Sequence, residues 1–469
     1  MNVFPLKFRQ WDDGSFLFAD DAGGFFRSDE TFLIRYAKGM LTDEDLSFLE
    51  ENGHVYRQID DYSFNAFMYR WAKRLYAPGD LDYVILVPTL RCNLSCGYCQ
   101  VSRVNENTPG FDWDETTLQA TLKFLDSLKT TRMKVEFQGG EPLLRIDLLE
   151  RVREFCRKRF DVVEFVVCTN LHQLGTREWA FISADDTYVS TSLDANASVH
   201  QRQRTITAER TAEFFGNLRR AIDILGPSKV SALPTLDVRN LPDPRSVIES
   251  FTSFEMRSIY LRPVNYQGFA RKQFQALDSA VRWNAYHAEF IDAMIDYNWT
   301  ANEPVEEYYF VHCLRRVLRS GHNGHSDLRN PNVLGQSYLV IDHDGVFYPT
   351  DEARMVTRIG RIDLSMGNVR TGLSSVTVDA LNAEATNNLH PDCVHCSYQP
   401  FCGVDLVDDL SRYGRIDMPK HDTDFCRRHT HLFDKVFELI YSEDPKVRKS
   451  VAIWAGMPEY DPAIAKVHA

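Results

Sequence analysis

The chain contains 469 residues, of which 44% are hydrophobic and 25% are charged, and its formal net charge is −13. A chain of this length is expected to fold into two or three domains. Its negative charge argues against nonspecific binding to nucleic acid, which requires a basic surface. No apolar run approaches the roughly 20 residues of a membrane span, and the N-terminus lacks the pattern of a signal peptide. We therefore expect a cytoplasmic protein without a membrane partner.

Residues 1–80 are predicted to form a small α+β unit. Apolar segments at 16–18 and 25–26 flank a turn rich in Asp and Gly, a pattern typical of a hairpin. Two short helices are predicted at 29–36 and 42–52. This arrangement resembles the winged-helix leader-binding domains of peptide-modifying enzymes, which implies a leader peptide as a partner. A structural cap on the next domain explains the pattern equally well.

From residue 81 to about residue 300, apolar strands alternate with helical segments. The predicted strands are 83–88, 133–137, 163–168, 187–192, 230–236 and 259–264. The helical segments between them include 115–128, 146–158 and 211–225. Six strand–helix units indicate a parallel sheet with right-handed crossovers. Periodicity alone allows either a partial barrel or a doubly wound open sheet.

The alternation stops in residues 301–469. This region contains a predicted turn at 321–324, a hairpin pattern at 338–348 and a helical tail at 429–441. We expect it to form a separate C-terminal domain.

A loop with three cysteines follows the first predicted strand. Cys92, Cys96 and Cys99 have the spacing Cys-x3-Cys-x2-Cys, and Tyr98 precedes the last of them. In a reducing compartment, patterned cysteines indicate a metal centre rather than disulfides. Cysteine thiolates are the usual ligands of iron–sulfur clusters, and three of them would leave one iron open to another ligand. A zinc site or three unrelated thiols are the alternatives.

Polar residues also stand at the ends of the later strands, where strand–helix barrels place their active sites. Gly139, Gly140 and Glu141 follow the second strand, and Asn170 follows the third. Ser192 ends the fourth strand, Arg204 lies twelve positions further on, and Val264 ends the sixth. Taken one at a time, these residues have ordinary structural roles as turn, strand-end or surface residues.

Together, these motifs resemble those of the radical S-adenosylmethionine (SAM) enzymes over residues 83–204. The resemblance implies an α/β fold, a partial (β/α)6 TIM-like barrel over 81–300. It also implies that Cys92, Cys96 and Cys99 hold a [4Fe–4S] cluster whose open iron chelates SAM. The implied SAM-binding residues are Tyr98, Gly139, Gly140, Glu141, Asn170, Ser192, Arg204 and Val264, with Glu141 on the SAM amino group and Val264 against the adenine.

A second cysteine group lies in the C-terminal region, at Cys393, Cys396, Cys402 and Cys426. By itself, this group indicates either a structural zinc site or a [4Fe–4S] cluster. Over residues 335–430 it resembles the SPASM domain of radical SAM peptide maturases, which implies an auxiliary [4Fe–4S] cluster.

This chain departs from the full SPASM pattern at two ligand positions. Leu406 and Thr350 stand where that family has further cysteines. We therefore expect one auxiliary cluster rather than two. Asp351 aligns with the proton acceptor of the sulfatase-maturating members, which implies a catalytic role; a turn or helix-cap role is the alternative.

The whole chain resembles the B-type radical SAM maturases of the His-Xaa-Ser peptide system. The resemblance implies an oxidoreductase that cleaves SAM reductively and uses the 5′-deoxyadenosyl radical to modify a side chain of a ribosomally made peptide or protein. Implied partners are a precursor with His-Xaa-Ser repeats, a low-potential electron donor such as flavodoxin or ferredoxin, and a second maturase of the same system. The alternatives are formylglycine formation on sulfatases and a non-catalytic leader-peptide adaptor with structural zinc sites.

Overall fold

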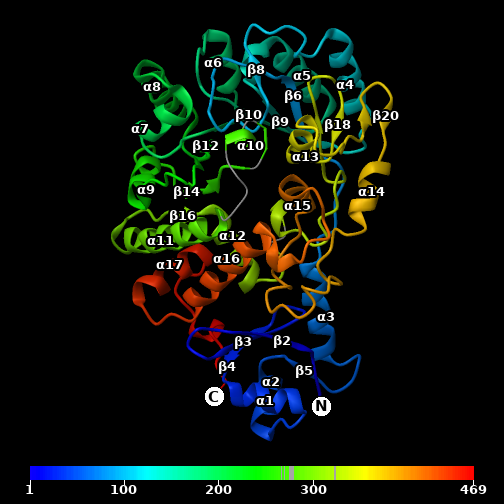
Figure 1. Cartoon of the computed structure of the whole chain (residues 1–469), viewed down its shortest axis with the longest axis vertical. Coiled ribbons are helices and arrows are strands. Elements are labelled where there is room, and N and C mark those ends of the chain that lie inside the picture. Colours follow the sequence, from blue (N-terminus) through cyan, green and yellow to red (C-terminus); the bar gives the residue numbers. More distant parts are fainter. Residues whose placement is uncertain (266, 269, 274–278, 322–323, 469) are drawn as a thin grey trace.

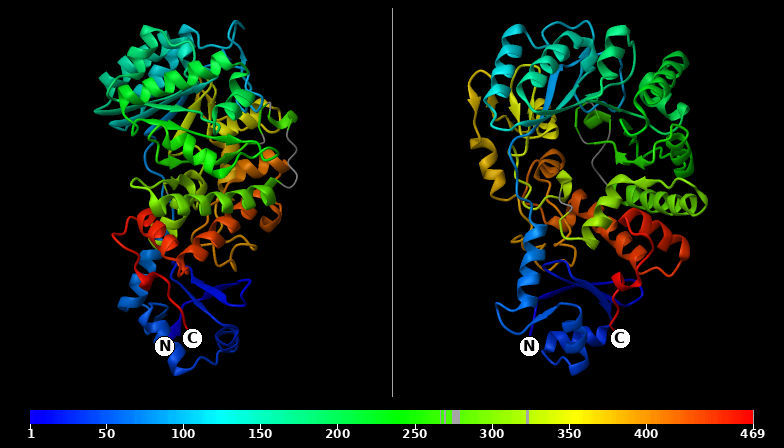
Figure 2. Two further views of the ribbon diagram at one scale, coloured as in Figure 1. Left: turned by 90° about the vertical axis from the view of Figure 1, so that its left-hand side faces the viewer. Right: turned by 180° about the vertical axis from the view of Figure 1, so that it is seen from behind.

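The computed structural model describes residues 1–265, 267–268, 270–273, 279–321 and 324–468 (Figure 1). The strand–helix region lies at the top of Figure 1, the C-terminal helices lie in the middle, and the N-terminal unit lies at the bottom with both chain ends. Two further views show the same order (Figure 2). None of the helices in the described ranges combines the length and the apolar character that crossing a membrane requires.

The N-terminal unit contains the predicted hairpin and both predicted helices. Its antiparallel sheet has the order β2 (Leu6–Gln10), β3 (Phe16–Asp20) and β4 (Phe25–Ser28), and β1 (Asn2–Val3) pairs with β5 (Val55–Tyr56). Its helices are α1 (Glu30–Lys38), α2 (Asp43–Glu51) and α3 (Tyr62–Arg74). The unit has a small apolar core formed by Leu6, Phe16, Phe18, Phe26, Phe32, Leu49 and Val55. The domain boundary at residue 80 stays a prediction.

The edge of β4 is occupied by a segment from the other end of the chain. The backbone nitrogen of Arg27 donates to the carbonyl of Lys466 at 2.9 Å, and that of His468 donates to the carbonyl of Arg27 at 2.8 Å. The His468 ring stacks on Phe48 at 4.4 Å and lies 2.7 Å from the carboxylate of Asp45. This segment therefore extends the N-terminal sheet as a short parallel strand.

The central sheet has seven strands in the order β12-β11-β10-β9-β6-β17-β18. Five parallel strands come from the predicted alternation: β6 (Tyr83–Thr89), β9 (Arg132–Gly139), β10 (Val162–Cys168), β11 (Thr187–Thr191) and β12 (Val230–Ala232). The helices that follow them are α4 (Glu115–Ser127), α5 (Ile146–Arg159), α6 (Thr176–Ile182), α7 (Ala197–His200), α8 (Ala208–Leu225), α9 (Pro244–Thr252) and α10 (Ala270–Gln273). The predicted α/β fold with a parallel sheet is confirmed.

The fifth and sixth predicted strands are each divided into two. The fifth consists of β12 and β13 (Thr235–Leu236), separated at Pro234, which has no N–H to donate to a neighbouring strand. The sixth consists of β14 (Ser258–Ile259) and β15 (Arg262–Pro263). Between these halves, the backbone nitrogen of Leu261 donates to the side chain of Glu307 at 3.0 Å instead of to a strand. The second halves, β13 and β15, pair in parallel and continue the barrel.

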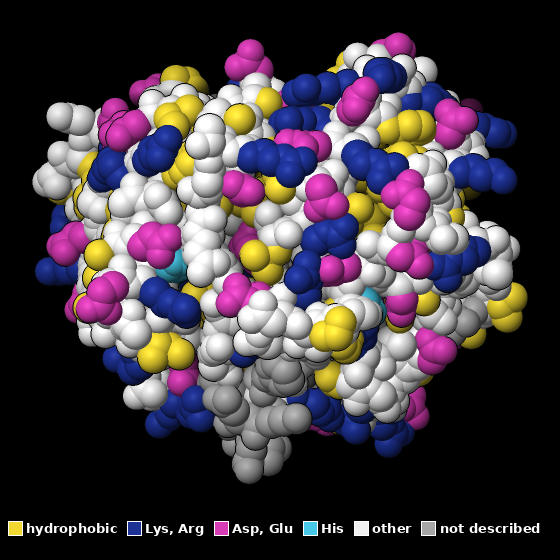
Figure 3. Space-filling view, turned by 90° about the horizontal axis from the view of Figure 1, so that it is seen from above, with side chains coloured by type: hydrophobic (Ala, Val, Ile, Leu, Met, Phe, Trp, Pro, Cys, Tyr) yellow, Lys and Arg dark blue, Asp and Glu magenta, His cyan; other side chains and the backbone are white. Residues whose placement is uncertain are grey.

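The predicted hairpin at 338–348 joins this sheet. Its first strand, β17 (Tyr338–Ile341), pairs in parallel with β6, and its second, β18 (Phe347–Tyr348), is antiparallel to β17. The hairpin that we assigned to the C-terminal region therefore extends the barrel sheet beyond its first strand. Seen from the barrel end, acidic and basic side chains are interspersed over the surface (Figure 3).

The C-terminal region is mainly helical. It is preceded by α11 (Ser279–Thr300), and its own helices are α12 (Tyr308–Leu318), α13 (Asp351–Arg358), α14 (Val376–Asn382), α15 (Leu406–Tyr413), α16 (Asp424–Ile440) and α17 (Pro445–Ala455). The remaining short strands are β7 (Arg91–Cys92), β8 (Val104–Asn105), β16 (Glu306–Glu307), β19 (Gly367–Asn368) and β20 (Gly372–Leu373).

The predicted tail helix begins earlier than expected, at Asp424, because the side chain of Thr423 caps it. The predicted turn at 321–324 includes residues 322 and 323, which lie outside the described residues.

Candidate active site at the three-cysteine loop

The three-cysteine loop lies at the carboxyl end of β6. Cys92 is buried, and its Sγ lies 3.4 Å from the backbone nitrogen of Leu94 and 3.8 Å from the side-chain nitrogen of Asn170. Burial raises the pKa of the Cys92 thiol to about 12. A thiolate at this position therefore needs a cationic centre beside it, as a metal cluster provides. All ten cysteines of the chain are free of disulfides.

Gly139 and Gly140 pack against the backbone that leads into this loop. A Cβ on Gly139 would lie 2.2 Å from the carbonyl oxygen of Thr89, and a Cβ on Gly140 would lie 2.2 Å from that of Arg91. Gly139 also has a φ of 135°, which favours glycine. The two glycines thus allow β9 to approach the start of the cysteine loop. Their predicted contact with the cofactor stays a prediction.

Gly140→Ala is expected to displace the cysteine loop. The added Cβ would meet backbone atoms, so the strand or the loop must shift, at a cost of about 1–3 kcal/mol. We expect a lower thermal midpoint and less iron bound after reconstitution. Gly216→Ala is the matched control, because a Cβ at Gly216 in α8 meets nothing within 4 Å. Equal iron content in the two variants would contradict this expectation.

Glu141 is enclosed at the junction of β9 and β10. Only 1% of its surface is exposed, and its carboxylate accepts hydrogen bonds from the backbone nitrogens of Leu143, at 3.2 Å, and Asn170, at 2.8 Å. Burial outweighs these hydrogen bonds and raises the pKa of Glu141 to about 7. A cation beside the carboxylate would favour its ionised form. This environment fits the predicted contact with an amino group.

The raised pKa of Glu141 predicts a pH-dependent stability. Between the ordinary pKa of 4.5 and about 7, the folded protein holds a proton that the unfolded chain has released. The free energy of unfolding therefore falls as pH rises through this window, by about 1 kcal/mol between about pH 6 and pH 8. Glu141→Gln should remove this fall. Thermal unfolding of the metal-free protein at both pH values measures it, and an unchanged pH dependence in the variant would refute the assignment.

Asn170 connects Glu141 to the cysteine loop. Its backbone nitrogen donates to Glu141, while its side-chain nitrogen donates to the side chain of Asn93 at 2.8 Å and faces the sulfur of Cys92. The end of the third strand is thereby tied to the first cysteine. Such outer contacts orient the ligands of a metal centre.

Asp194, which sequence reasoning missed, joins two of the predicted cofactor residues. This fully buried carboxylate accepts hydrogen bonds from Arg204, at 2.8 Å, and from the hydroxyl of Tyr98. Its second oxygen accepts from the backbone nitrogen of Thr235 at 3.0 Å. The guanidinium of Arg204 also lies 5.0 Å over the Tyr98 ring. An acidic residue three positions after the end of a barrel strand, β11, was the signal that could have identified Asp194.

The last two predicted cofactor residues lie at neighbouring strand ends. Ser192 is half-buried and directly follows β11. Val264 is half-buried and follows β15, and its backbone nitrogen donates to the carbonyl of Leu236 at 3.0 Å. Both therefore stand at the carboxyl edge of the sheet, and their contacts with SAM stay predictions.

A second polar cluster lies inside the barrel. Glu136 of β9 accepts hydrogen bonds from the hydroxyl of Tyr83, at 2.5 Å, and from the thiol of Cys168, at 3.2 Å. Burial raises the pKa of the Cys168 thiol well above its usual value, and Glu136 adds to this rise. Cys168 is therefore a protonated thiol that faces a carboxylate.

Asp351 lies close to this interior cluster. It is the first residue of α13, which is capped by Thr350, so the helix-cap alternative for Asp351 is wrong. Burial raises its pKa, the ion pair with Arg354 at 2.7 Å opposes the rise, and the carboxylate of Glu136 adds to it. Asp351 is thus a buried carboxyl whose pKa is raised, in the direction of neutral pH.

The four C-terminal cysteines converge beside α16. Cys393, Cys396 and Cys402 lie in turns, and Cys426 lies in the first turn of α16. Burial raises the pKa of each thiol. At Cys402 the other three thiols and the buried Cys313 add to this rise, so all four of these thiols lie near Cys402.

The sulfur positions bear on the choice between a single metal ion and a cluster. Tetrahedral zinc, with Zn–S distances of about 2.3 Å, holds its sulfurs about 3.8 Å apart. Within the described ranges, no three cysteine sulfurs lie within 4.8 Å of one another. Neither group is thus gathered as tightly as a bound zinc ion would hold it, and the assignment of both groups to [4Fe–4S] clusters stays a prediction.

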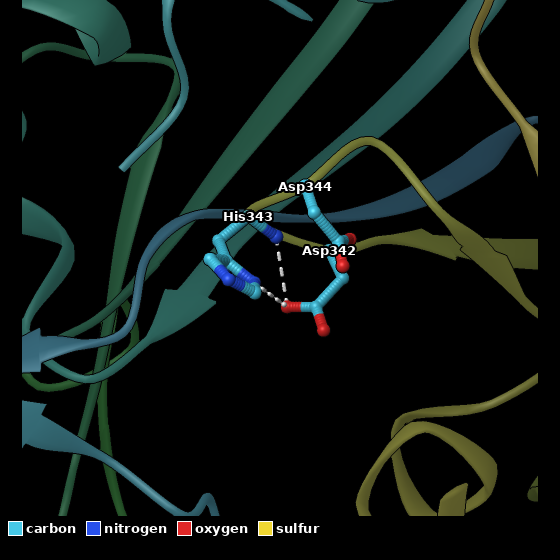
Figure 4. Close-up of side chains that lie close together, drawn as sticks. All are labelled: Asp342, His343 and Asp344. Atoms are coloured by element: carbon cyan, nitrogen blue, oxygen red, sulfur yellow. Dashed lines mark hydrogen bonds and ion pairs between the residues drawn. The ribbon is translucent and has the colours of Figure 1, made fainter. Parts of the chain in front are cut away.

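One compact group of possible metal ligands lies in the β17–β18 turn. Asp342, His343 and Asp344 place their ligand atoms within 4.8 Å of one another (Figure 4). The buried Asp342 also lies 3.2 Å from the guanidinium of Arg358 and 3.7 Å from that of Arg354. Because two cations already compensate this carboxylate, the group is an ion-pair network that anchors the turn.

A cavity of about 250 Å³ has walls that include neighbours of both cysteine groups. On one side it is lined by Gln267, whose neighbour Gly268 packs against the carbonyl of Gln100, next to the three-cysteine loop. On the other side it is lined by Tyr309, whose pKa is raised by burial and, in smaller part, by the thiol of Cys402. The barrel and the C-terminal region both contribute to its walls.

Comparisons with known proteins agree with this geometry. Residues 86–239 match the model of the Radical SAM superfamily. The GTP 3′,8-cyclase of Rhodococcus opacus is 29% identical over 149 residues, 31% of this chain and 41% of that protein. The enzyme of the same name from Petrotoga mobilis is 24% identical over 243 residues, 49% of this chain and 69% of that protein. An uncharacterised protein of Methanocaldococcus jannaschii is 29% identical over 116 residues, 24% of this chain and 39% of that protein. The match with this protein and the match with the Rhodococcus enzyme each span about two fifths of the relative's own length.

The fold likeness extends over a larger part of the chain. The structure of native anSMEcpe with bound AdoMet has a TM-score of 0.59 and 17% identity, and covers 79% of this chain and 99% of that one. The structure of the same protein with AdoMet and the Cp18Cys peptide has a TM-score of 0.59 and 16% identity, with the same coverage. The likeness therefore reaches beyond the barrel into the C-terminal region.

The chain contains a radical SAM domain, and this superfamily is a class of enzymes that use a [4Fe–4S] cluster and SAM. The cofactors predicted from the three-cysteine loop are thus those of the matched superfamily. Membership of the His-Xaa-Ser maturases stays a prediction.

Proposed function

We propose that the chain is a radical SAM enzyme that modifies a side chain of a ribosomally made peptide or protein. The observation that carries this proposal is the cavity whose walls include neighbours of the three-cysteine loop and of the second cysteine group. Cys92, Cys96 and Cys99 would hold the [4Fe–4S] cluster, which with SAM would supply radical chemistry for hydrogen abstraction from a substrate. The walls of the cavity would orient the substrate and exclude water.

The residues around the loop have distinct proposed roles. Glu141 would bind the amino group of SAM, because a cation favours its buried carboxylate. Ser192 and Arg204 would hold SAM from the next strand end, and Asp194 orients Arg204 for this. Val264 would pack on the adenine.

Asp351 is the proposed proton acceptor. Its raised pKa supports this role, since a base that works near neutral pH needs a pKa shifted toward that range.

One auxiliary [4Fe–4S] cluster would be held by Cys393, Cys396, Cys402 and Cys426. This cluster would either accept the electron from the product radical or stabilise the C-terminal region.

The charge of the cavity favours a peptide over a nucleotide substrate. Several relatives are GTP 3′,8-cyclases, but the cavity of this chain is lined by the carboxylates of Asp327, Glu352 and Asp405. These side chains would repel a triphosphate.

The proposed partners are a precursor peptide, with His-Xaa-Ser repeats as one form, a flavodoxin or ferredoxin, and a second maturase. The ten free cysteines support a reducing compartment such as the cytoplasm.

Metal analysis and SAM cleavage test this proposal together. Two [4Fe–4S] clusters predict about eight iron atoms per chain after anaerobic reconstitution. With dithionite and SAM, the protein should release 5′-deoxyadenosine. Cys402→Ala should lower the iron content to about four atoms, whereas Cys156→Ala, in α5 and outside both groups, should leave it unchanged. Zinc without sulfide in the anaerobically purified protein would refute the proposal and favour the adaptor.

A further inference from the structure

The walls of the cavity carry more carboxylates than cations. Five acidic side chains line it: Glu307, Asp327, Glu352, Asp405 and Asp408. Asp327 and Asp405 accept hydrogen bonds through Oδ1, from the Ser326 hydroxyl at 3.1 Å and from the backbone nitrogens of Val407 and Asp408 at 3.0 Å. Two of the five have both carboxylate oxygens engaged by neighbours. The first, Glu307, accepts hydrogen bonds from two backbone nitrogens at 3.0 and 2.5 Å, and Asp408 lies 2.9 Å from Arg412.

The other three carboxylates form a group that faces the cavity. Asp327, Glu352 and Asp405 are each half-buried, although they lie deep in the molecule, because their exposed surface faces the cavity. Burial raises the pKa of Glu352 to about 7, and Asp351 and Asp327 add to the rise. Burial, Asp408, Asp327 and Glu352 likewise raise the pKa of Asp405. At Asp327, burial is instead outweighed by nearby histidines and Arg428, which lower its pKa, so Asp327 favours its charged form. A cation in the cavity would favour the ionised forms of Glu352 and Asp405 as well.

The basic groups on the walls do not balance these charges. Arg428 is bound to Asp424 at 2.6 Å, which leaves Arg262 as a lining cation for three carboxylates. His325 and His431 favour their neutral forms, because burial lowers the pKa of His325 and lowers that of His431 to about 3.

Two further polar groups on the walls have no hydrogen-bond partner among the described residues. The Oε1 atom of Gln267 and the Nε2 atom of His287 are buried without one, and each side chain is about 3% exposed. Both residues line the cavity. An unsatisfied buried acceptor such as the Gln267 oxygen costs free energy unless a donor reaches it from the cavity.

We propose that this cavity receives a cationic side chain, lysine or arginine, of the peptide substrate. This inference rests on the proposed function and specifies its substrate. An ammonium or guanidinium group carries only donors, which is what three carboxylates and the free oxygen of Gln267 require. The volume of about 250 Å³ suits one side chain, since pockets for drug-sized ligands measure about 300–1,000 Å³.

A divalent metal ion is a poorer occupant than a cationic side chain. Within the described ranges, the ligand atoms of Asp327, Glu352 and Asp405 do not come within 4.8 Å of one another. A flexible ammonium or guanidinium group can bridge carboxylates at wider spacing through separate hydrogen bonds.

Binding of short peptides to the full-length reconstituted protein with SAM tests the proposal. The probes are acetyl-Gly-Gly-Lys-Gly-Gly-amide and the same peptide with arginine, norleucine or glutamate at the centre, measured by calorimetry. Norleucine has a similar chain without the charge. The lysine and arginine peptides should bind at least about tenfold more tightly than the norleucine peptide, as expected for a desolvated charge pair.

Two conservative variants locate the effect. Glu352→Gln and Asp405→Asn should each reduce the preference for lysine over norleucine by at least about threefold, and asparagine can still cap α15 as Asp405 does. Glu443→Gln, an exposed carboxylate outside the cavity, is the control and should leave the preference unchanged.

Equal binding of all four peptides, or no binding of any at up to about 10 mM, would overturn the proposal, as would a lysine preference that survives in both cavity variants. The readout does not depend on SAM cleavage. Absence of 5′-deoxyadenosine would therefore refute the proposed function alone, and absence of a lysine preference would refute this inference alone.

Discussion

Cys92→Ala is expected to abolish the release of 5′-deoxyadenosine while leaving the chain folded. The three thiols of the loop form one ligand set, and removal of one opens the cluster to loss of iron. Mutation of a residue that only contacts a metal ligand lowers metal affinity or activity by about 10–100-fold. Because Cys92→Ala removes a ligand itself, we expect the release of 5′-deoxyadenosine to fall by more than about a hundredfold. The fold should persist, because alanine fills most of the space of cysteine in this loop.

The measurement is the amount of 5′-deoxyadenosine formed from SAM under anaerobic reducing conditions. Cys156→Ala is the matched control, since Cys156 is fully buried in α5 and belongs to neither group. Circular dichroism establishes that both variants are folded. Continued release at the wild-type level by Cys92→Ala would show that the loop does not hold the cluster.

Asp194→Asn is expected to cause a large loss of stability together with weaker SAM binding. Asp194 is fully buried and is the counter-ion of Arg204, whose side chain is 14% exposed. Loss of one partner of a buried ion pair costs about 3–5 kcal/mol, because the other charge remains buried. The amide of asparagine also presents N–H donors to a guanidinium that offers no acceptor.

A double-mutant cycle separates this charge effect from a general disturbance of packing. In the double variant Asp194→Asn/Arg204→Gln, the unpaired buried guanidinium of Arg204 is also removed. This variant should therefore recover part of the stability that Asp194→Asn loses. Asp185→Asn, at an exposed carboxylate before β11, serves as the control. Thermal unfolding and the affinity for SAM provide the readouts. Strict additivity of the two substitutions would show that the pair is not coupled.

The parts of the fold that depend on local pattern were predictable from the sequence. The first four barrel strands begin and end within two residues of their predicted bounds, because apolar runs between turn signals mark buried parallel strands. The interruptions of the fifth and sixth strands depend on longer-range contacts. The break at Leu261 arises because Glu307, far along the chain, takes its backbone hydrogen bond.

The site shows the same division between local and distant information. The cysteine spacing was visible as a motif, whereas Asp194 becomes significant only when folding brings Tyr98 and Arg204 to it. The glycines illustrate a different limit. Their small size was predicted to serve a ligand, but the structure shows that they admit the backbone at Thr89 and Arg91. The glycine motif indicates that another group approaches the backbone closely, but the sequence does not show whether that group is a ligand or another part of the chain.

The cavity was not predictable from the sequence at all. Its walls come from the end of the sixth strand, from α11 and α12, and from the segments beside the second cysteine group. No local motif joins these segments, because their carboxylates come from parts of the chain that are far apart in sequence and meet only in the folded chain.

The strand contributed by Lys466–His468 has a consequence for the synthesis of this protein. Asp45 and His468 are 423 positions apart, so the N-terminal sheet acquires its fourth strand only after the ribosome has translated the intervening barrel and helices. Until then, β4 presents an unpaired edge that can associate with other nascent chains. Slow translation or truncation before residue 466 should therefore favour aggregation through the first part of the chain to emerge.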